Sequence, residues 1–434
     1  MKISVIGCGY LGAVHAACMA ELGHDVVGVD VDAAKILDLA AGRAPFYEPG
    51  LPELLRAGVA SGRLRFSTDF ADVAEATVHF VAVGTPQSKD GAAADLRYVD
   101  AAVTALREHA AVGSLIVGKS TVPVGTSARL SELLDGSGLS LAWNPEFLRE
   151  GRAVQDTLHP DRLVYGVDRA KDGDGAVALL DEVYAQALLA ETPRIVTDFA
   201  TAELVKVSAN AFLATKISFI NAMAEIAEAT GADVTQLADA IGHDARIGRS
   251  FLNSGLGFGG GCLPKDIRAF QARADELGVG ASLGFLREVD AINLRRRDRM
   301  VELTREALGG SVAGKRIAVL GLAFKPESDD VRDSPALDVA STLHAEGAIV
   351  VATDPEAVET SRRIHPDLDY VATAAEAAAG ADAVLVLTEW KQYRELVPAD
   401  LSAAAGQVIL DGRNCLDADL WRGADWTYRA LGRP

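Results

Sequence analysis

One cysteine of this sequence stands where a nucleophile could be built. Cys262 follows a glycine-rich run, residues 257–261, and directly precedes a predicted helix. Pro264 suits the first position of that helix and Asp266 suits its first turn. The Cys262 sulfur is therefore expected near free backbone N–H groups and the positive end of a helix dipole, which favour thiolate over thiol. The alternative is a buried small cysteine in a glycine hairpin.

The N-terminus carries a dinucleotide-binding fingerprint. A predicted buried strand, Lys2–Ile6, runs into a glycine turn and then into a predicted helix over residues 13–22. Gly7 permits the tight turn, Gly9 lets a pyrophosphate approach the backbone, and Gly12 lets helix and strand pack closely. The helix N-terminus then faces the phosphates. The full turn consists of Gly7, Cys8, Gly9, Tyr10, Leu11 and Gly12.

A carboxylate at the end of the next predicted strand indicates which dinucleotide binds. Asp30 ends the strand predicted over residues 25–30. Its distance along the chain from Gly12 is close to the roughly 20 residues expected between the last glycine of the turn and a ribose-binding acid. Its carboxylate can accept hydrogen bonds from the adenosine ribose and would repel a 2′-phosphate. The pattern therefore predicts NAD rather than NADP, the alternative being an ordinary cap at a strand end.

A nicotinamide cofactor together with a poised thiol predicts oxidation beyond the aldehyde. Turning an aldehyde into an acid requires a tetrahedral adduct that can be oxidised again. A cysteine provides it, because the thiolate adds to the aldehyde, the thiohemiacetal is oxidised to a thioester, and water releases the acid. The reaction also needs a base, an oxyanion stabiliser and a group that activates water.

Two pairs of polar residues are candidates for these roles. Lys206 and Asn210 are four residues apart on a predicted helix and can present a cation and an amide to an oxyanion, at about 3 kcal/mol each. Glu146 and Glu150 lie in a loop after a strand, where either could act as a base or position water. The alternatives are a solvated helix face for the first pair and helix capping for the second.

Two further side chains belong to this set. The Thr121 hydroxyl could relay a proton for the glutamates. Asp266, four residues after Cys262, either orients a lysine or a water molecule or caps its own helix. The eight histidines form no HxxxH motif, so a metal site is not expected.

Composition limits the classes of partner. The chain of 434 residues has a formal net charge of -19, which argues against nucleic acid or an anionic membrane as a partner. An anionic small ligand remains compatible, because several cations stand beside glycine-rich or motif-like segments: Lys206, Arg246, Lys265, Lys325 and Arg413. Four cysteines without CxxC pairs, and no signal or membrane segment, predict a reducing, cytoplasmic enzyme.

Strand and helix patterns alternate at both ends of the chain. This alternation predicts parallel sheets in an α/β fold with two doubly wound Rossmann-like domains joined by a long central helix. We expect an NAD-binding domain over residues 1–200, a central helical, dimerising domain over 201–308, and a nucleotide-sugar-binding α/β domain over 309–434. The C-terminal turn, residues 321–325, lacks the glycines of a second NAD fingerprint.

Taken together, these motifs resemble those of the UDP-glucose/GDP-mannose dehydrogenase family over essentially the whole chain. The matching segments stand in a fixed order: residues 7–12, 84–86, 120–125, 144–151, 203–206 with Asn210, 257–266, 321–325 and 411–414. One departure is Thr353, where the family commonly has tyrosine, which leaves any contact at that strand end open.

The resemblance implies a four-electron oxidation of a nucleotide sugar at C6 by two NAD, in a homodimer. By this likeness Cys262 is the nucleophile, Lys206 and Asn210 hold the oxyanion, Asp266 and Glu150 handle water, and Thr121 and Glu146 sit at the reacting centre. Contacts to NAD are implied for the glycine turn with Tyr10 and Leu11, and for Asp30, Lys35, Thr85, Thr121, Glu150 and Lys265. Contacts to the nucleotide sugar are implied for Glu146, Phe147, Leu148, Lys206, Asn210, Phe251, Leu252, Gly259, Lys325 and Arg413, with Arg246 reaching across a subunit interface.

The motifs bear on three functions: a nucleotide-sugar dehydrogenase, a two-electron hydroxyacid or hydroxyacyl dehydrogenase, and a non-catalytic sensor. Arg246-Ile247-Gly248 resembles the UDP-glucose branch most, and GDP-mannose is the second candidate substrate. A two-electron hydroxyacid dehydrogenase would leave the Cys262 segment and the C-terminal domain unexplained. A non-catalytic sensor of NAD or a nucleotide sugar is disfavoured by intact Cys262, Lys206 and Asp266.

Overall fold

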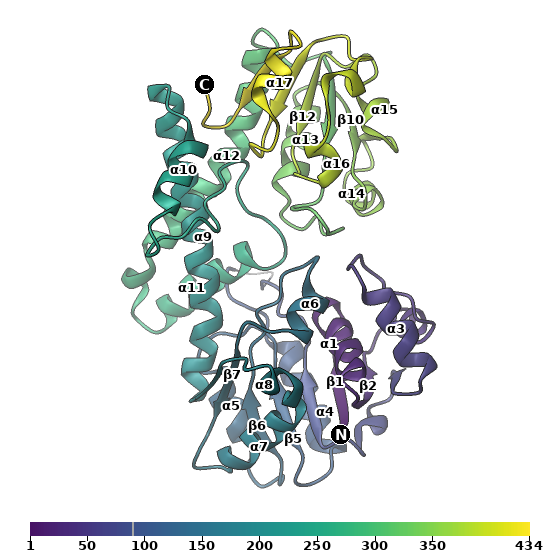
Figure 1. The fold of residues 1–434 in the computed structure, drawn as a ribbon. Helices are drawn as coiled ribbons and strands as arrows, with labels where there is room; N and C mark the ends of the chain where they lie inside the picture. Colours follow the sequence, from purple (N-terminus) through teal and green to yellow (C-terminus); the bar gives the residue numbers. More distant parts are fainter. Residues whose placement is uncertain (89–90) are drawn as a thin grey trace. The chain divides into compact units, whose positions relative to one another are not determined.

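The computed structural model describes residues 1–88 and 91–434 (Figure 1). By its internal contacts the chain divides into two compact units: residues 1–209 with 268–278, and residues 210–267 with 279–434. Two of the boundaries fall inside helices, α9 (Phe199–Thr230) and α11 (Leu263–Glu276), and the third, between residues 278 and 279, lies just after α11. The structure therefore has two α/β units joined by a long helix, as the sequence predicts.

The first unit is built on an eight-stranded sheet in the order β3-β2-β1-β4-β5-β6-β7-β8. Its first six strands have the order typical of a dinucleotide-binding fold. The strands are β1 (Lys2–Ile6), β2 (Asp25–Val29), β3 (Leu64–Ser67), β4 (Val78–Val81), β5 (Leu115–Gly118), β6 (Ser140–Trp143), β7 (Leu163–Val167) and β8 (Arg194–Thr197). The helices are α1 (Tyr10–Glu21), α2 (Ala33–Ala40), α3 (Leu51–Ala60), α4 (Arg97–His109), α5 (Thr126–Leu133), α6 (Ala153–Leu158), α7 (Gly173–Val183) and α8 (Ala185–Leu189), with a 3₁₀ turn at Phe70–Val73.

One pairing in this sheet differs from the predicted parallel arrangement. Strands β6 and β7 are antiparallel, with Ala142 opposite Val167. The connection between them carries only the short helix α6, and it returns to the sheet at the edge where β6 ends. A parallel pair would need a crossover to the opposite edge. The first unit is therefore a mixed sheet.

The core of the first unit lies on both faces of the sheet. Along β5, Leu115 and Val117 pack in one apolar cluster while Ile116 packs in another, because successive side chains of a strand point to opposite faces. Helices that cover both faces bury every residue of β4 and β5. This two-sided burial explains why these strands read as continuous apolar runs.

The second unit contains an all-parallel six-stranded sheet in the order β11-β10-β9-β12-β13-β14. The strands are β9 (Arg316–Leu320), β10 (Ile349–Thr353), β11 (Asp369–Tyr370), β12 (Ala383–Val386), β13 (Val408–Asp411) and β14 (Thr427–Ala430). The helices are α10 (Val234–Gly242), α12 (Phe285–Ala307), α13 (Pro335–Ala345), α14 (Val358–Ile364), α15 (Ala374–Ala378), α16 (Lys391–Arg394) and α17 (Ala418–Arg422), with 3₁₀ turns at Gly280–Leu283 and Pro398–Leu401.

Two predicted helix starts need correction. Helix α1 begins at Tyr10, directly after the glycine turn, and not at Ala13. Helix α11 begins at Leu263, so Pro264 is its second residue. A proline is tolerated there because the first N–H groups of a helix have no partner within the helix.

The described residues contain neither a membrane-spanning helix nor a group of metal ligands. In the part of the chain that the structure describes, no helix has both the length and the apolar character needed to cross a membrane. Across residues 1–88 and 91–434, no three His, Cys, Asp or Glu side chains gather as metal ligands would.

Candidate active site

The glycine turn after β1 has the geometry that a dinucleotide needs. Gly7 has a φ of +88°, which a side chain would strain, and a Cβ at Gly12 would lie 1.7 Å from the Gly7 carbonyl oxygen. A Cβ at Gly9 would meet nothing within 4 Å. Each glycine is thus required by the turn or the packing, except Gly9, which leaves open space above the backbone. The turn fits a pyrophosphate.

Asp30 follows β2 and faces this turn. Its carboxylate accepts hydrogen bonds from the Cys8 N–H at 2.8 Å, from the Asp32 N–H at 3.0 Å and from Lys35 Nζ at 2.9 Å. Burial opposes its ionisation, but the bonds from Asp32, Lys35 and Cys8 outweigh that effect and lower the pKa of Asp30. Asp30 is therefore an anionic acceptor beside the glycine turn, which is compatible with a ribose.

The loops after β4 and β5 are tied together. Thr85 donates a hydrogen bond from its hydroxyl to the Thr121 carbonyl oxygen at 2.8 Å, and Ser120 donates from its hydroxyl to the Val83 carbonyl oxygen at 2.7 Å. The structure thus brings the predicted cofactor residues Thr85 and Thr121 together at the carboxyl edge of neighbouring strands, where open α/β sheets bind ligands.

A buried carboxylate that the sequence did not single out connects the turn to the Glu150 segment. Glu48 accepts hydrogen bonds from the Tyr10 hydroxyl, from the Gly151 N–H at 2.7 Å and from the Ala153 N–H at 2.7 Å. It therefore caps the start of α6 and fixes Tyr10, so that the predicted cofactor residue Tyr10 is connected to the backbone at Gly151, directly after Glu150. Only its place in a turn before α3 could have drawn attention to it.

Glu146 and Lys206 form an ion pair in the first unit. Their Oε1 and Nζ atoms are 2.9 Å apart, and both side chains are largely buried. Glu146 also accepts a hydrogen bond from the Leu148 N–H at 2.6 Å, and Lys206 lies over the Phe147 ring at 5.7 Å. The structure therefore brings together four residues predicted to contact substrate, at the C-terminal end of β6.

Another buried glutamate on α9 holds the Thr121 loop in place. Glu203 accepts hydrogen bonds from the Gly125 N–H and the Ser127 N–H, both at 2.7 Å, and from the Ser127 hydroxyl at 2.5 Å. It thus caps α5 from a different element. Glu203 lies one helical turn before Lys206, so this cap relates the Thr121 loop to the Lys206 position. Glu203 belongs to the matching segment 203–206, but no pattern in the sequence predicts this contact.

The glycine-rich run before Cys262 is fixed by close backbone packing in the second unit. Asn293 on α12 accepts a hydrogen bond from the Phe258 N–H at 2.7 Å and donates one to the Phe258 carbonyl oxygen at 2.9 Å. A Cβ at Gly257 would lie 2.2 Å from Asn293 Oδ1, and one at Gly259 would lie 2.2 Å from the Asp333 carbonyl oxygen. These glycines are therefore required sterically, and the run is not a loose hairpin.

Cys262 is exposed and occupies the N-cap position of α11. Its carbonyl oxygen accepts the first helical hydrogen bond, from the Asp266 N–H at 2.9 Å. An N-cap side chain lies at the positive end of the helix dipole, which stabilises a thiolate. By contrast, Cys8 and Cys18 are buried, and burial raises the pKa of both thiols. The predicted alternative of a buried Cys262 is wrong.

Asp266 joins two other predicted residues of the second unit. It accepts hydrogen bonds from Asn210 Nδ2 at 2.7 Å and from Lys265 Nζ at 2.7 Å, and it is buried. It therefore holds an amide and an ammonium group at the start of α11. Lys206 and Asn210 share α9 but have different partners, Glu146 for the first and Asp266 for the second.

The predicted nucleotide-sugar residues of the second unit are placed as follows. Arg413 donates hydrogen bonds to the carbonyl oxygens of Leu387 at 2.8 Å, Gly257 at 2.9 Å and Phe324 at 3.2 Å, so it joins three loops. Lys325 lies over the Phe324 ring at 5.5 Å. Asp354 stands at the end of β10, directly after Thr353, the position where the family commonly has tyrosine. Its carboxylate accepts hydrogen bonds from two backbone N–H groups of the turn after β9.

The segment after α10 presents the remaining predicted residues. Arg246 is exposed and pairs with Asp244 at 2.6 Å. Phe251 is exposed at a positive φ of 65°, whereas Leu252 is buried. An exposed arginine is compatible with a contact to another subunit.

These features define the class of protein: a dinucleotide-binding dehydrogenase with a second Rossmann-like sheet. Three models of the UDP-glucose/GDP-mannose dehydrogenase family match the chain: the NAD binding domain at residues 1–188, the central domain at 200–295 and the UDP binding domain at 318–418. The chain belongs to this family, which confirms the predicted resemblance.

Individual relatives agree with this assignment. The chain is 42% identical over 440 residues to a UDP-glucose 6-dehydrogenase of Rhizobium meliloti, covering 100% of both chains. It is 42% identical to the UDP-glucose 6-dehydrogenase TuaD of Bacillus subtilis, covering 100% of this chain and 93% of that one. The structure matches that of a UDP-glucose dehydrogenase from Pyrobaculum islandicum with a TM-score of 0.89 and 39% identity, covering 100% of this chain and 98% of that one.

Proposed function

We propose that this protein is a UDP-glucose 6-dehydrogenase that oxidises UDP-glucose to UDP-glucuronate with two NAD. The observation that carries the proposal is the exposed thiol of Cys262 at the N-cap of α11, in a chain whose first sheet has an NAD-type turn. Full-length similarity to proteins named UDP-glucose 6-dehydrogenase supports UDP-glucose over GDP-mannose.

The cofactor site is assigned to the residues around the first glycine turn. Asp30 and Lys35 would hold the adenosine ribose, and Thr85 and Thr121 would hold the nicotinamide half. When bound, NAD takes two electrons from C6 in each of two oxidations. The resemblance to the family also implies contacts from Glu150 and Lys265, and the proposal includes them.

The roles at the reacting carbon follow from the chemistry. The Cys262 thiolate forms a C–S bond with the aldehyde at C6, while Lys206 and Asn210 stabilise the resulting oxyanion. After the second oxidation that bond belongs to a thioester. Water then adds at C6, the C–S bond breaks, and the thiolate is regained. Asp266 would activate the water.

Substrate choice is the direct test of this proposal. The purified protein should be given NAD with UDP-glucose, GDP-mannose and a UDP-N-acetyl sugar in parallel, and NADH followed at about 340 nm, where reduced nicotinamide absorbs. We expect UDP-glucose to give the highest kcat/KM. Higher kcat/KM with GDP-mannose would establish the second candidate, and no reduction with any sugar would support a sensor.

Replacing Asp30 with alanine should weaken NAD binding selectively. The loss of a charged hydrogen-bond acceptor costs about 1.5–3 kcal/mol, or roughly 10- to 100-fold in Kd. Calorimetry with NAD and with UDP-glucose checks this. Asp38→Ala is the control, because Asp38 lies on the following helix α2, its side chain is 47% exposed and it pairs with Arg43 at 2.6 Å. Equal losses for both ligands would contradict the assignment.

We propose a homodimer formed through α9. Three apolar side chains of this helix are exposed at seven-residue intervals: Phe212 at 68%, Phe219 at 48% and Ile226 at 56%. Seven-residue spacing places them on one face, as in helices that pack against a second copy. We also propose a cytoplasmic location and a division of the chain into three domains, over residues 1–200, 201–308 and 309–434.

Placing a charge in this face should separate the subunits. Phe219→Glu is expected to shift the protein from dimer to monomer in light scattering coupled to size exclusion, because a carboxylate would be buried unpaired in the interface. Leu189→Glu is the control, since Leu189 is 84% exposed on another helix. A Phe219→Glu protein that stays dimeric would contradict the proposed interface.

A further inference from the structure

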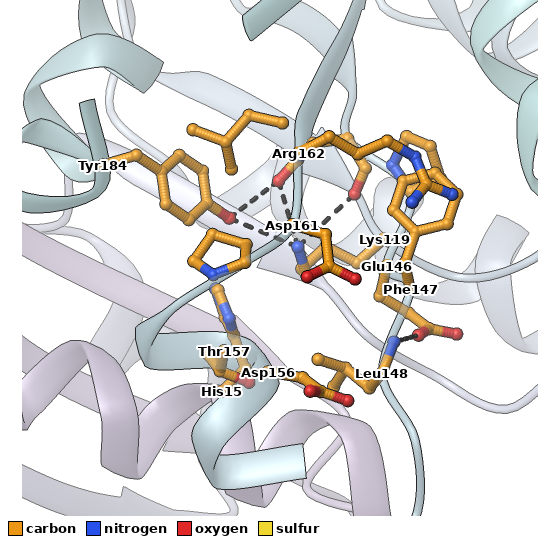
Figure 2. A pocket seen from close by; sticks show the side chains of 14 residues that line it. His15, Lys119, Glu146, Phe147, Leu148, Asp156, Thr157, Asp161, Arg162 and Tyr184 are labelled. Atoms are coloured by element: carbon orange, nitrogen blue, oxygen red, sulfur yellow. Dashed lines mark hydrogen bonds between the residues drawn. The ribbon is translucent and has the colours of Figure 1, made fainter. Parts of the chain in front are cut away.

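Lys119 is a buried cation that the proposed chemistry does not use. It directly follows β5 and is only 6% exposed. It lines a pocket of the first unit together with residues from α1, from the segment after β6 and from the end of α7. In Figure 2 its ammonium group points toward the Tyr184 hydroxyl. Such a group needs an explanation because lysine is rarely buried completely.

The ammonium group is held by neutral acceptors. Lys119 Nζ donates to Asn144 Oδ1 at 3.0 Å, to the Asn144 carbonyl oxygen at 3.4 Å and to the Tyr184 hydroxyl at 3.2 Å. Tyr184 in turn donates to Asn144 Oδ1 at 2.7 Å, and Asn144 Nδ2 donates to the Val164 carbonyl oxygen at 3.0 Å. Asn144, the first residue after β6, is thus fixed from three sides.

Burying this charge costs stability. None of the ion pairs found among the described residues includes Lys119, although the Phe80 and Tyr184 rings lie 5.7 and 5.8 Å from its nitrogen. Burial lowers the pKa of Lys119 to about 8, with Glu146 raising it and Lys206 lowering it. An apolar side chain of similar length would avoid this cost. A role in activity would explain the charge.

Asn144 positions the segment after β6, which carries the predicted reacting residue Glu146. Glu146 follows two residues later and pairs with Lys206 at 2.9 Å. The Phe147 ring contacts Arg162 at 3.7 Å on the pocket side, as Figure 2 shows, and Lys206 at 5.7 Å. A shift at Asn144 would therefore move Glu146 and Phe147 relative to α9.

We propose that Lys119 is a positioning residue of the reaction: its ammonium group fixes Asn144 and thereby sets where Glu146 meets Lys206. This inference rests on the proposed function, because it assumes that Glu146 and Lys206 act on the substrate. A displacement near 1 Å at a reacting group can cost about 100-fold in rate.

The charge of Lys119 gives the proposal a pH signature. The groups that face its pocket are His15 on α1, Glu146, Asp156, Asp161 and Arg162 around the β6–β7 connection, and Tyr184, with Lys206 acting from α9. Burial lowers the pKa of His15 and raises that of Tyr184, so both stay neutral near pH 8. Lys119 is thus the group of this pocket that loses charge as the pH rises through about 8.

The test compares the wild-type enzyme with Lys119→Met between pH 6.5 and about 9.5. At pH 7 the variant should have a kcat/KM lower by about 10-fold or more, and the ratio of wild type to variant should shrink above pH 8 as the wild type loses its charge. Below pH 8 the variant should melt at the same temperature as wild type or higher, which a merely structural lysine would not allow.

Two further variants complete the design. Lys171→Met is the matched control, because Lys171 is exposed and pairs with Asp135 at 2.7 Å, and it should leave the profile unchanged. Tyr184→Phe removes one hydrogen-bond acceptor from the Lys119 ammonium group. The activity of this variant should therefore fall at a lower pH than that of the wild type. This comparison tests the proposal even if Lys119→Met fails to fold.

The experiment distinguishes failure of the Lys119 proposal from failure of the proposed function. A ratio that does not change with pH, wild-type activity of Lys119→Met at pH 7, or an unmoved alkaline limb in Tyr184→Phe would overturn the role of Lys119. A wild-type protein that reduces no NAD with UDP-glucose would overturn the proposed function and the inference with it, and the wild-type arm alone reports that failure.

Discussion

Cys262→Ala is expected to lower the rate of UDP-glucuronate formation by about 10⁴-fold or more, as the loss of a covalent nucleophile does in other enzymes. The reason is that no other group would hold the half-oxidised C6 as an adduct that can be oxidised again. Product is measured by chromatography of the nucleotide sugars after incubation with NAD. Binding of NAD and of UDP-glucose should be retained.

The matched control for this variant is Cys18→Ala. Cys18 is buried in α1, so its loss should reduce stability modestly through the small cavity while leaving the rate near wild type. Acid formation by Cys262→Ala at a rate comparable with wild type would refute covalent catalysis at this sulfur.

Lys206→Met should lower kcat by about 100- to 1000-fold, the usual loss when an oxyanion donor is removed. Methionine keeps the apolar stem of the lysine, so packing against Phe147 should survive. NAD affinity should change little, because the assigned cofactor residues are others. Steady-state kinetics with UDP-glucose and a separate titration with NAD measure the two effects.

A double variant distinguishes two explanations of that loss. Lys206 pairs with Glu146 at 2.9 Å, so its removal also leaves a carboxylate unpaired in a largely buried place. The reference is Glu146→Gln alone, because Glu146 is itself placed at the reacting centre. If Lys206 serves only to neutralise Glu146, the double variant should be no slower than Glu146→Gln. If Lys206 stabilises an oxyanion, the double variant should be about 100- to 1000-fold slower than Glu146→Gln.

Features that depend on local sequence were predictable. The strand Lys2–Ile6, its glycine turn and the acid Asp30 lie within one βαβ unit, where the turn conformation dictates glycine and the next strand end dictates the acid. The long central helix was predictable because no glycine or proline interrupts its pattern, and the structure has it over Phe199–Thr230. Such signals need no knowledge of distant contacts.

Features that depend on tertiary contacts were not predictable. Glu48, Lys119, Glu203 and Asn293 each bind backbone or side-chain groups of elements far away in the chain. Glu203 belongs to a matching segment of the family, but no local pattern indicates which groups any of the four contacts. The antiparallel β7 was missed for the same reason, since strand direction depends on where the preceding connection lies. Side chains that position reacting groups are thus harder to find from sequence than the reacting groups themselves.

The most direct test of the central claim is the number of NADH molecules formed per UDP-glucose consumed by the wild-type enzyme. With NAD in excess and limiting UDP-glucose, oxidation at one carbon from alcohol to acid releases four electrons. The account predicts two NADH per sugar and UDP-glucuronate as the product. One NADH per sugar, with an aldehyde released, would contradict it.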